Sequence, residues 1–189
     1  KTNSKKILFL GQVYTDASMI YGLNNFNHPI ELIGLLLEWL EKNNHSLLIK
    51  LHPKEHTGKN PITQKPYADV TYRLILEHHS DRIARLGHRI LIDSKNEYDT
   101  YDLIEQSDLV ATANSQAGLE AAIMGKSVIH GRQCFYGGLG FTHEYQDKLD
   151  IELRLNQALQ EGPKNINDAK KFFYILFEKY CIRKTPSAV

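Results

Sequence analysis

This sequence has few cysteines and no long apolar run. Its two cysteines, Cys134 and Cys181, cannot form a disulfide framework, and the sequence has no cluster of thiols at metal-ligand spacing. No apolar run approaches the roughly 20 residues that span a bilayer. The apolar stretch after the basic start, Lys1 to Lys6, is too short for a signal peptide. We therefore expect a soluble, cytoplasmic protein without a transmembrane segment, and peripheral attachment at the inner membrane face stays open.

An excess of charge of one sign is also missing. Lys and Arg number 23 against 22 Asp and Glu, a formal net charge of +1, which argues against a nucleic-acid-binding protein. A hydrophobic fraction of 42% and a charged fraction of 24% are ordinary for a globular chain. The length of 189 residues suits one α/β domain, residues 1–189. Because the first predicted strand follows Lys1 almost at once, we also expect a piece of a longer protein.

Nine histidines suggest metal binding, but their spacing argues against it. His78, His79 and His88 are close in sequence, yet the first two are adjacent on a predicted helix and point to different faces. No cysteine, aspartate or glutamate completes an obvious tetrahedral set with them. We therefore expect neither a metal ion nor a cofactor.

Short β-rich runs alternate with helical patterns along the whole chain. The runs are nearly continuous in apolar residues, which is typical of strands buried on both faces, and the alternation implies crossover connections. The sequence therefore predicts an α/β fold, a Rossmann-like parallel sheet with helices on both faces. The predicted strands are residues 7–13, 46–51, 89–92, 109–113 and 127–129, and the predicted helices are residues 29–43, 70–79, 98–106, 115–124, 151–160 and 166–181.

Four loop segments follow predicted strands, where open α/β sheets bind their ligands. They are residues 11–26, 53–67, 114–115 and 131–144, and the second contains three prolines and a glycine. Because the carboxyl ends of parallel strands meet at the same edge of a sheet, we expect these loops to gather there. A ligand site is therefore predicted at this edge.

The strand end at Thr112 and the helix after it form the most informative segment. Asn114 can leave the strand and Ser115 can cap the helix, whose free amides and positive dipole end would suit a phosphate. Gly118 would let a ligand approach the first turn, and Glu120 could accept hydrogen bonds from ribose hydroxyls. The alternative is structural, with Ser115 only a cap and Glu120 a solvated carboxylate.

The second predicted strand ends in Lys50, His52 and Pro53, which we take as candidate substrate-binding residues. Proline stops the strand and fixes the turn, so His52 would be held at the sheet edge. There it could donate a hydrogen bond to a phosphate or protonate it as it leaves. The alternative is a strand-end histidine bonded to a carbonyl group.

Gln12 and Asp16 follow the first predicted strand and are the candidate catalytic residues. A carboxylate on this loop of a doubly wound sheet is well placed to act on a bound sugar. Considered alone, Asp16 is an acidic residue in a loop, and the alternative to a catalytic role is a structural role in a turn or as a helix N-cap.

Together these segments resemble a known family. The order is Q-x-x-x-D after the first strand, K-x-H-P after the second, then D-x-V-x-T-x-N-S-x-x-G-L-E-A-x-x-x-G-K-x-V-I and a later Y-x-x-x-G-F-T, from Gln12 to Thr142. This pattern is similar to that of the bacterial capsule-polysaccharide biosynthesis proteins and, more narrowly, of the retaining β-Kdo transferases of capsule and lipopolysaccharide assembly. The resemblance implies CMP-Kdo as the donor and one lobe of the two-lobed GT-B fold.

The resemblance also implies roles for individual residues. The acid of Q-x-x-x-D, implicated as the nucleophile, falls on Asp16 with Gln12 beside it, and the H-P motif that contacts the CMP phosphate falls on His52 and Pro53. The other motif residues are Asn114, Ser115, Gly118, Leu119 and Glu120, followed by Tyr136, Gly140, Phe141 and Thr142.

Two positions depart from the family pattern. Gln116 stands where relatives commonly have threonine in N-S-T, and Ser127 stands where they have proline in G-K-P. Gln116 therefore lacks the hydroxyl that a threonine would offer to a phosphate at this position.

The resemblance implies that this chain is the donor-binding lobe of a retaining glycosyltransferase. A glycan or glycolipid acceptor would bind mainly to a missing N-terminal lobe, against which the last predicted helix, residues 166–181, could pack. One alternative is an inverting GT-B enzyme that uses a UDP-, GDP- or CDP-sugar, with Asp16 as base or structural residue. Another is a non-catalytic nucleotide-binding module of a capsule complex, which would have no need of Asp16.

Overall fold

The computed structural model describes residues 4–22, 28–131 and 133–181. Parts of the predicted domain 1–189 and of the predicted loops 11–26 and 131–144 therefore lie outside the described residues. Within these ranges a 6-stranded sheet has the order β3-β2-β1-β4-β5-β6, and every neighbouring pair is parallel. The predicted Rossmann-like parallel sheet is confirmed. The strands are β1 (Lys6–Leu10), β2 (Ser46–Lys50), β3 (Ile90–Asp93), β4 (Leu109–Thr112), β5 (Ser127–Gly131) and β6 (His143–Tyr145).

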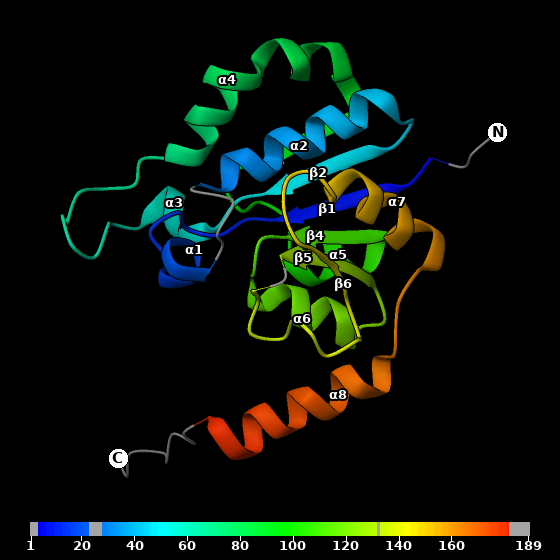
Figure 1. Ribbon diagram of the computed structural model, residues 1–189. Helices are drawn as coiled ribbons and strands as arrows, with labels where there is room; N and C mark the ends of the chain where they lie inside the picture. The colour runs from blue at the N-terminus through cyan, green and yellow to red at the C-terminus, as the bar shows by residue number, and fades with distance from the viewer. Residues whose placement is uncertain (1–3, 23–27, 132, 182–189) are drawn as a thin grey trace.

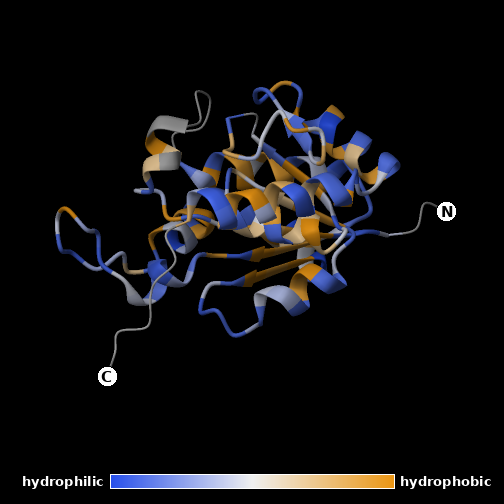
Figure 2. Ribbon diagram, turned by 90° about the horizontal axis from the view of Figure 1, so that it is seen from below, coloured by the Kyte–Doolittle hydropathy of each residue, from blue (hydrophilic) through white to orange (hydrophobic). Residues whose placement is uncertain are grey.

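Helices cover both faces of the sheet (Figure 1). α2, α4 and α7 lie on one face and α5, α6 and α8 on the other, and each layer buries its own hydrophobic cluster. Figure 2 shows strands that are coloured as apolar and helices in which hydrophobic and hydrophilic residues alternate. No helix in the described ranges is long and apolar enough to cross a membrane. The helices are α1 (Ala17–Gly22), α2 (Pro29–Lys42), α3 (Pro53–Thr57), α4 (Val70–Leu86), α5 (Thr100–Gln106), α6 (Gln116–Ile123), α7 (Ile151–Glu161) and α8 (Ile166–Ile175), with a 3-10 turn at Gly87–Arg89 and a π-helical turn at Leu176–Tyr180.

β1 runs between β2 and β4 and alternates its side chains between the two clusters. Ile7 and Phe9 belong to the cluster beneath α2, whereas Leu8 and Leu10 belong to the cluster beneath α6, because successive strand side chains point to opposite faces. Burying each such side chain stabilises the fold by roughly 1.5–3 kcal/mol. The loops that leave the carboxyl ends of the strands therefore start from firmly packed positions.

The structure differs from the sequence prediction in several short elements. β1 ends at Leu10 instead of residue 13, because only the Gly11 amide continues the pairing with β2, at 2.8 Å from the Lys50 carbonyl oxygen, before the chain turns at Tyr14 and Thr15. α3 lies inside the predicted loop 53–67 and α1 inside the predicted loop 11–26. β6 has only 3 residues and lies at the sheet edge. Elements this short carry no recognisable hydrophobic period.

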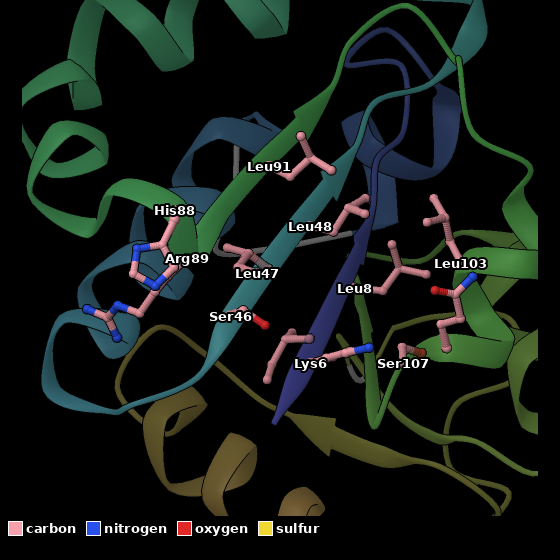
Figure 3. Close-up of a pocket in the computed structure, with 12 residues that line it drawn as sticks. Lys6, Leu8, Ser46, Leu47, Leu48, His88, Arg89, Leu91, Leu103 and Ser107 are labelled. Atoms are coloured by element: carbon pink, nitrogen blue, oxygen red, sulfur yellow. The ribbon is translucent and has the colours of Figure 1, made fainter. Parts of the chain in front are cut away.

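One cavity lies at the amino-terminal ends of the strands (Figure 3). It has a volume of about 280 Å³, and Leu8, Leu48 and Leu91 line it from three neighbouring strands in register. Leu103 of α5 lies across from them. Because open α/β sheets bind ligands outside the carboxyl ends of their strands, this cavity is not the candidate site.

Candidate functional site

The three motif segments meet at the carboxyl edge of the sheet. Leu10 at the end of β1 pairs in register with Lys50 of β2 on one side and with Thr112 of β4 on the other. The loop to Asp16, the turn at His52 and the turn before α6 therefore leave the sheet next to one another. This arrangement follows from the strand order, in which β2, β1 and β4 are neighbours.

Two adjoining cavities occupy this edge and share one side chain. The first, about 250 Å³, is lined by Ser115, Tyr101 and Glu120, and we call it the Glu120 cavity. The second, about 230 Å³, is lined by Asp16 and is called the Asp16 cavity. His52 lines both. The histidine therefore stands at the junction of two compartments, one with a helix N-terminus and one with a carboxylate.

Ser115 caps α6, whose first turn opens on the Glu120 cavity. Its Oγ accepts from the Ala117 amide at 3.3 Å, which satisfies one of the free amides of the first turn. Thr112 is fully buried, and its Oγ1 accepts from the Ser115 amide at 3.2 Å while donating to the Leu10 carbonyl oxygen at 2.9 Å. The Thr112 hydroxyl thus orients the turn and has its hydrogen bonds within the protein.

Gln12 ties the first loop to the third. Its Oε1 accepts a hydrogen bond from the Asn114 amide at 2.8 Å, and both residues are buried. A side chain used in this way fixes the turn that leads into α6. Gln12 thus helps to hold the site together, and its catalytic role stays a prediction.

Gly118 and Leu119 shape α6 from beneath. A Cβ atom on residue 118 would lie 2.1 Å from the Tyr136 hydroxyl, which donates to the Ser115 carbonyl oxygen at 2.8 Å. Leu119 is fully buried in the hydrophobic cluster below the helix. Burial raises the pKa of Tyr136 well above its usual value, so the hydroxyl keeps its proton and remains a donor.

His130 in turn supports Tyr136. Its Nδ1 is 2.7 Å from the Gly131 carbonyl oxygen and its Nε2 is 2.7 Å from the Thr142 hydroxyl. Since a carbonyl only accepts, Nδ1 carries the proton and Nε2 accepts from Thr142. The ring packs edge-on against Tyr136 with centroids 4.6 Å apart. The motif residues Tyr136 and Thr142 thus brace the turn at Ser115, and both are buried.

His52 is the N-cap of α3, with Pro53 as the first helical residue. Its Nδ1 accepts from the Lys54 amide at 3.1 Å, so in the neutral ring the proton is on Nε2. Burial lowers the pKa of His52, Lys54 lowers it further and Asp16 opposes the shift. His52 is therefore a neutral hydrogen-bond donor near pH 7. The alternative for His52 was a hydrogen bond to a carbonyl group, but Nδ1 instead accepts from the Lys54 backbone amide.

The chain builds the same cap a second time at His28 and Pro29. Nδ1 of His28 accepts from the Ile30 amide at 3.1 Å and caps α2. His28 lines neither the Glu120 cavity nor the Asp16 cavity. The two histidines share one local geometry and differ in what surrounds them.

Lys50 lines the Glu120 cavity, and its ammonium group makes two hydrogen bonds within the protein. Nζ donates to Asp93 at 2.8 Å and to the Tyr98 carbonyl oxygen at 2.6 Å, and the ion pair is buried. Burial pushes the pKa of Asp93 upward, but hydrogen bonds from Lys50 and from the Glu97 amide outweigh it, so the pKa is lowered overall. Lys50 thus holds the loop after β3, and its contact with substrate stays a prediction, since an ammonium group has a third donor besides the two used here.

The loop that carries Asp16 is fixed by several contacts. Glu55 of α3 is buried, which raises its pKa, and its carboxylate accepts hydrogen bonds from Thr71 and from the Tyr14 amide. The Thr15 hydroxyl lies 2.6 Å from the Tyr67 hydroxyl. Asp16 itself is exposed and directly precedes α1. Its alternative as a helix-start residue therefore stays open.

Sequence reasoning missed Tyr101 at this site. Tyr101 lies on α5, and its hydroxyl donates to Glu120 Oε2 at 3.1 Å. No strand-end or motif signal marks it, because α5 starts several residues after β3.

Within the described residues no group of three or more His, Cys, Asp or Glu is arranged to hold a metal ion.

Comparisons with solved structures find similar folds. KpsC of Thermosulfurimonas dismutans, described as a β-Kdo 2,7 transferase, is 26% identical with a TM-score of 0.51, over 78% of this chain and 41% of that one. A second structure of KpsC from the same organism, described as a β-Kdo 2,4 transferase, is 23% identical with a TM-score of 0.53, over 91% of this chain and 52% of that one. A UDP-GlcNAc 2-epimerase of Methanocaldococcus jannaschii is 14% identical with a TM-score of 0.53, over 92% and 45%. The chain thus spans about half or less of these proteins.

The family comparison covers more of the chain. No curated protein sequence matches it. The family model described as capsule polysaccharide biosynthesis protein matches residues 1–176, which includes every motif residue from Gln12 to Thr142. The chain therefore belongs to the capsule polysaccharide biosynthesis protein family.

Proposed function

We propose that this chain is the donor-binding lobe of a retaining glycosyltransferase that uses a CMP-sugar, with CMP-Kdo as the donor. The observation that carries the proposal is the position of His52, which lines both the Glu120 cavity and the Asp16 cavity. A nucleotide in the first and a sugar in the second would be joined at a phosphate beside this histidine. The β-Kdo transferase description of the similar KpsC supports the choice of donor.

The groups around the junction suit a single phosphate. The Nε2–H of His52 and the Ser115 hydroxyl supply hydrogen-bond donors, and the dipole of α6 adds partial positive charge at the helix start. A monophosphate leaving group carries less charge than a diphosphate. These donors would therefore stabilise it without a metal ion.

The Asp16 cavity suits an acidic sugar. Lys54 and Lys59 line it together with Asp16, so two basic residues border the space in which the sugar would lie. In the proposed reaction the Asp16 carboxylate forms a bond to the anomeric carbon while the bond from that carbon to the CMP phosphate oxygen breaks. The acceptor hydroxyl then displaces Asp16 and loses its proton, and the two displacements together retain configuration.

A second lobe would supply the acceptor side of the cleft. α8 and the π-helical turn after it present exposed apolar side chains at Tyr174, Ile175, Phe177 and Tyr180, a surface suited to packing on such a lobe. A glycan or glycolipid acceptor would bind to that second lobe, at the cytoplasmic face of the inner membrane. The isolated chain should accordingly bind donor nucleotide but transfer sugar poorly or not at all.

A thermal-shift panel with CMP, UDP, GDP and CDP tests the proposal, because a ligand that binds the folded state raises the melting temperature by mass action. CMP should give the largest shift. A larger shift with UDP, GDP or CDP would instead favour the alternative, an inverting GT-B enzyme with another donor. No shift with any nucleotide would remove the nucleotide-sugar site.

A further inference from the structure

Both oxygens of the Glu120 carboxylate already have a donor within the protein. Oε1 accepts from the Gln116 side-chain amide at 3.1 Å, and Oε2 accepts from the Tyr101 hydroxyl at 3.1 Å. A carboxylate oxygen has two lone pairs, so one site on each oxygen is left for a ligand. The two donors hold the carboxylate plane in one orientation at the wall of the cavity.

Tyr101 is itself positioned by the loop that Lys50 holds. Asp99 caps α5 by accepting from the Tyr101 amide at 2.8 Å and the Asp102 amide at 3.1 Å, and Lys50 donates to the preceding Tyr98 carbonyl oxygen. The hydrogen bond to Glu120 raises the pKa of Tyr101. The hydroxyl therefore stays protonated and acts as a donor to the carboxylate.

Gln116 accounts for one departure from the family pattern. Where the motif has threonine after N-S, this chain directs a longer amide side chain along α6 to the carboxylate four residues on. Residues four apart on a helix lie on the same face. Gln116 is not among the residues that line the Glu120 cavity, whereas Tyr101 and Glu120 are. Its side chain thus acts on Glu120 from outside the cavity.

We infer that Tyr101 and Gln116 are positioning residues that hold the Glu120 carboxylate ready to accept two adjacent hydroxyls, so that the site selects a ribonucleotide over its 2′-deoxy counterpart. The inference rests on the proposed function, in which a nucleotide occupies the Glu120 cavity. One free acceptor site on each oxygen matches the two hydroxyls of a ribose. A 2′-deoxyribose would leave one of these acceptors without a donor.

Calorimetry with CMP and 2′-deoxy-CMP tests the inference on the wild-type chain and on Tyr101→Phe, which removes only the hydroxyl. The wild type should bind CMP about tenfold more tightly than 2′-deoxy-CMP, the effect of losing one charge-assisted hydrogen bond. Tyr101→Phe should weaken CMP several-fold and leave 2′-deoxy-CMP within about twofold. Gln116→Ala should narrow the preference in the same way. Tyr98→Phe, another exposed tyrosine before α5, is the matched control and should change neither affinity.

The outcomes separate the inference from the function on which it rests. Equal wild-type affinity for CMP and 2′-deoxy-CMP would overturn the inference and leave the CMP site standing. Equal loss of both ligands in Tyr101→Phe would also overturn it, because a purely structural tyrosine would not change the preference. If the wild type binds neither ligand nor any other nucleotide, the proposed function falls and the inference with it.

Discussion

Gly118 and Tyr136 fit together so closely that a Cβ atom on residue 118 would lie 2.1 Å from the tyrosine hydroxyl. That hydroxyl also donates to the Ser115 carbonyl oxygen. We predict that Gly118→Ala displaces the ring, breaks this hydrogen bond and lowers the free energy of unfolding by about 1–3 kcal/mol. Urea denaturation followed by circular dichroism measures the loss.

Tyr136→Phe is the matched variant, because it removes the hydroxyl alone and should cost about 1 kcal/mol. In the double variant the nearest ring atom to the new methyl group is Cζ, at 3.3 Å, so part of the clash is relieved. The double variant should therefore lose less than the sum of the single losses. Additive losses would mean that the two residues do not interact in this way.

His130 should make the fold sensitive to mild acid. Burial lowers its pKa from the usual 6.5, so the unfolded chain binds a proton more readily than the folded chain. The stability from the neutral ring is then complete above pH 6.5 and is lost as the pH falls through the lowered pKa. Between about pH 7.5 and 5.5 the wild type should lose more stability than His130→Gln, which cannot titrate. Parallel pH profiles for the two proteins would be the contrary result.

Lys50 should matter more for stability than for ligand contact. Lys50→Met leaves Asp93 buried without its cation, and breaking a buried pair of this kind costs about 3–5 kcal/mol. Replacing Asp93 as well, in Lys50→Met with Asp93→Leu, should recover much of the loss. Guanidinium unfolding of the three proteins measures this. If Lys50→Met is folded and as stable as the wild type but has lost CMP affinity, Lys50 contacts the substrate instead.

The sheet was predictable because its central strands are buried on both faces, and their sequences are therefore nearly continuous runs of apolar residues. β6 was not, because His143, Glu144 and Tyr145 carry no such run and lie at the edge. α3 was hidden by the prolines around it, although His52 and Pro53 are themselves a cap and a first helical residue.

The location of the candidate site was predictable for a topological reason, since strand ends in a parallel sheet share an edge. The partners of individual side chains were not. Lys50 pairs with Asp93, 43 residues later in the chain, and Tyr101 contacts Glu120 because α5 and α6 cover the same face of the sheet. Such contacts depend on tertiary structure, which no local pattern in the sequence encodes.

Asp16→Asn tests the proposed chemistry and requires the two-lobed protein. Transfer should be abolished, since the amide is a poor nucleophile, while CMP affinity stays nearly unchanged because the side chain acts on the sugar carbon. Mass spectrometry of the wild type should detect a sugar adduct on Asp16. Retained activity in Asp16→Asn would indicate a turn residue, for which asparagine substitutes well, and a product of inverted configuration would exclude the double displacement.

The most direct test of a CMP site at the junction of the two cavities is calorimetry of CMP binding to His52→Ala beside His28→Ala. Both variants remove the same Nδ1 cap from a helix and should lose a similar stability, about 1 kcal/mol. His52→Ala alone should also lose the phosphate donor and weaken CMP by about 1–3 kcal/mol, with His28→Ala close to the wild type. Unchanged CMP affinity in His52→Ala, or an equal loss in both variants, would contradict the account.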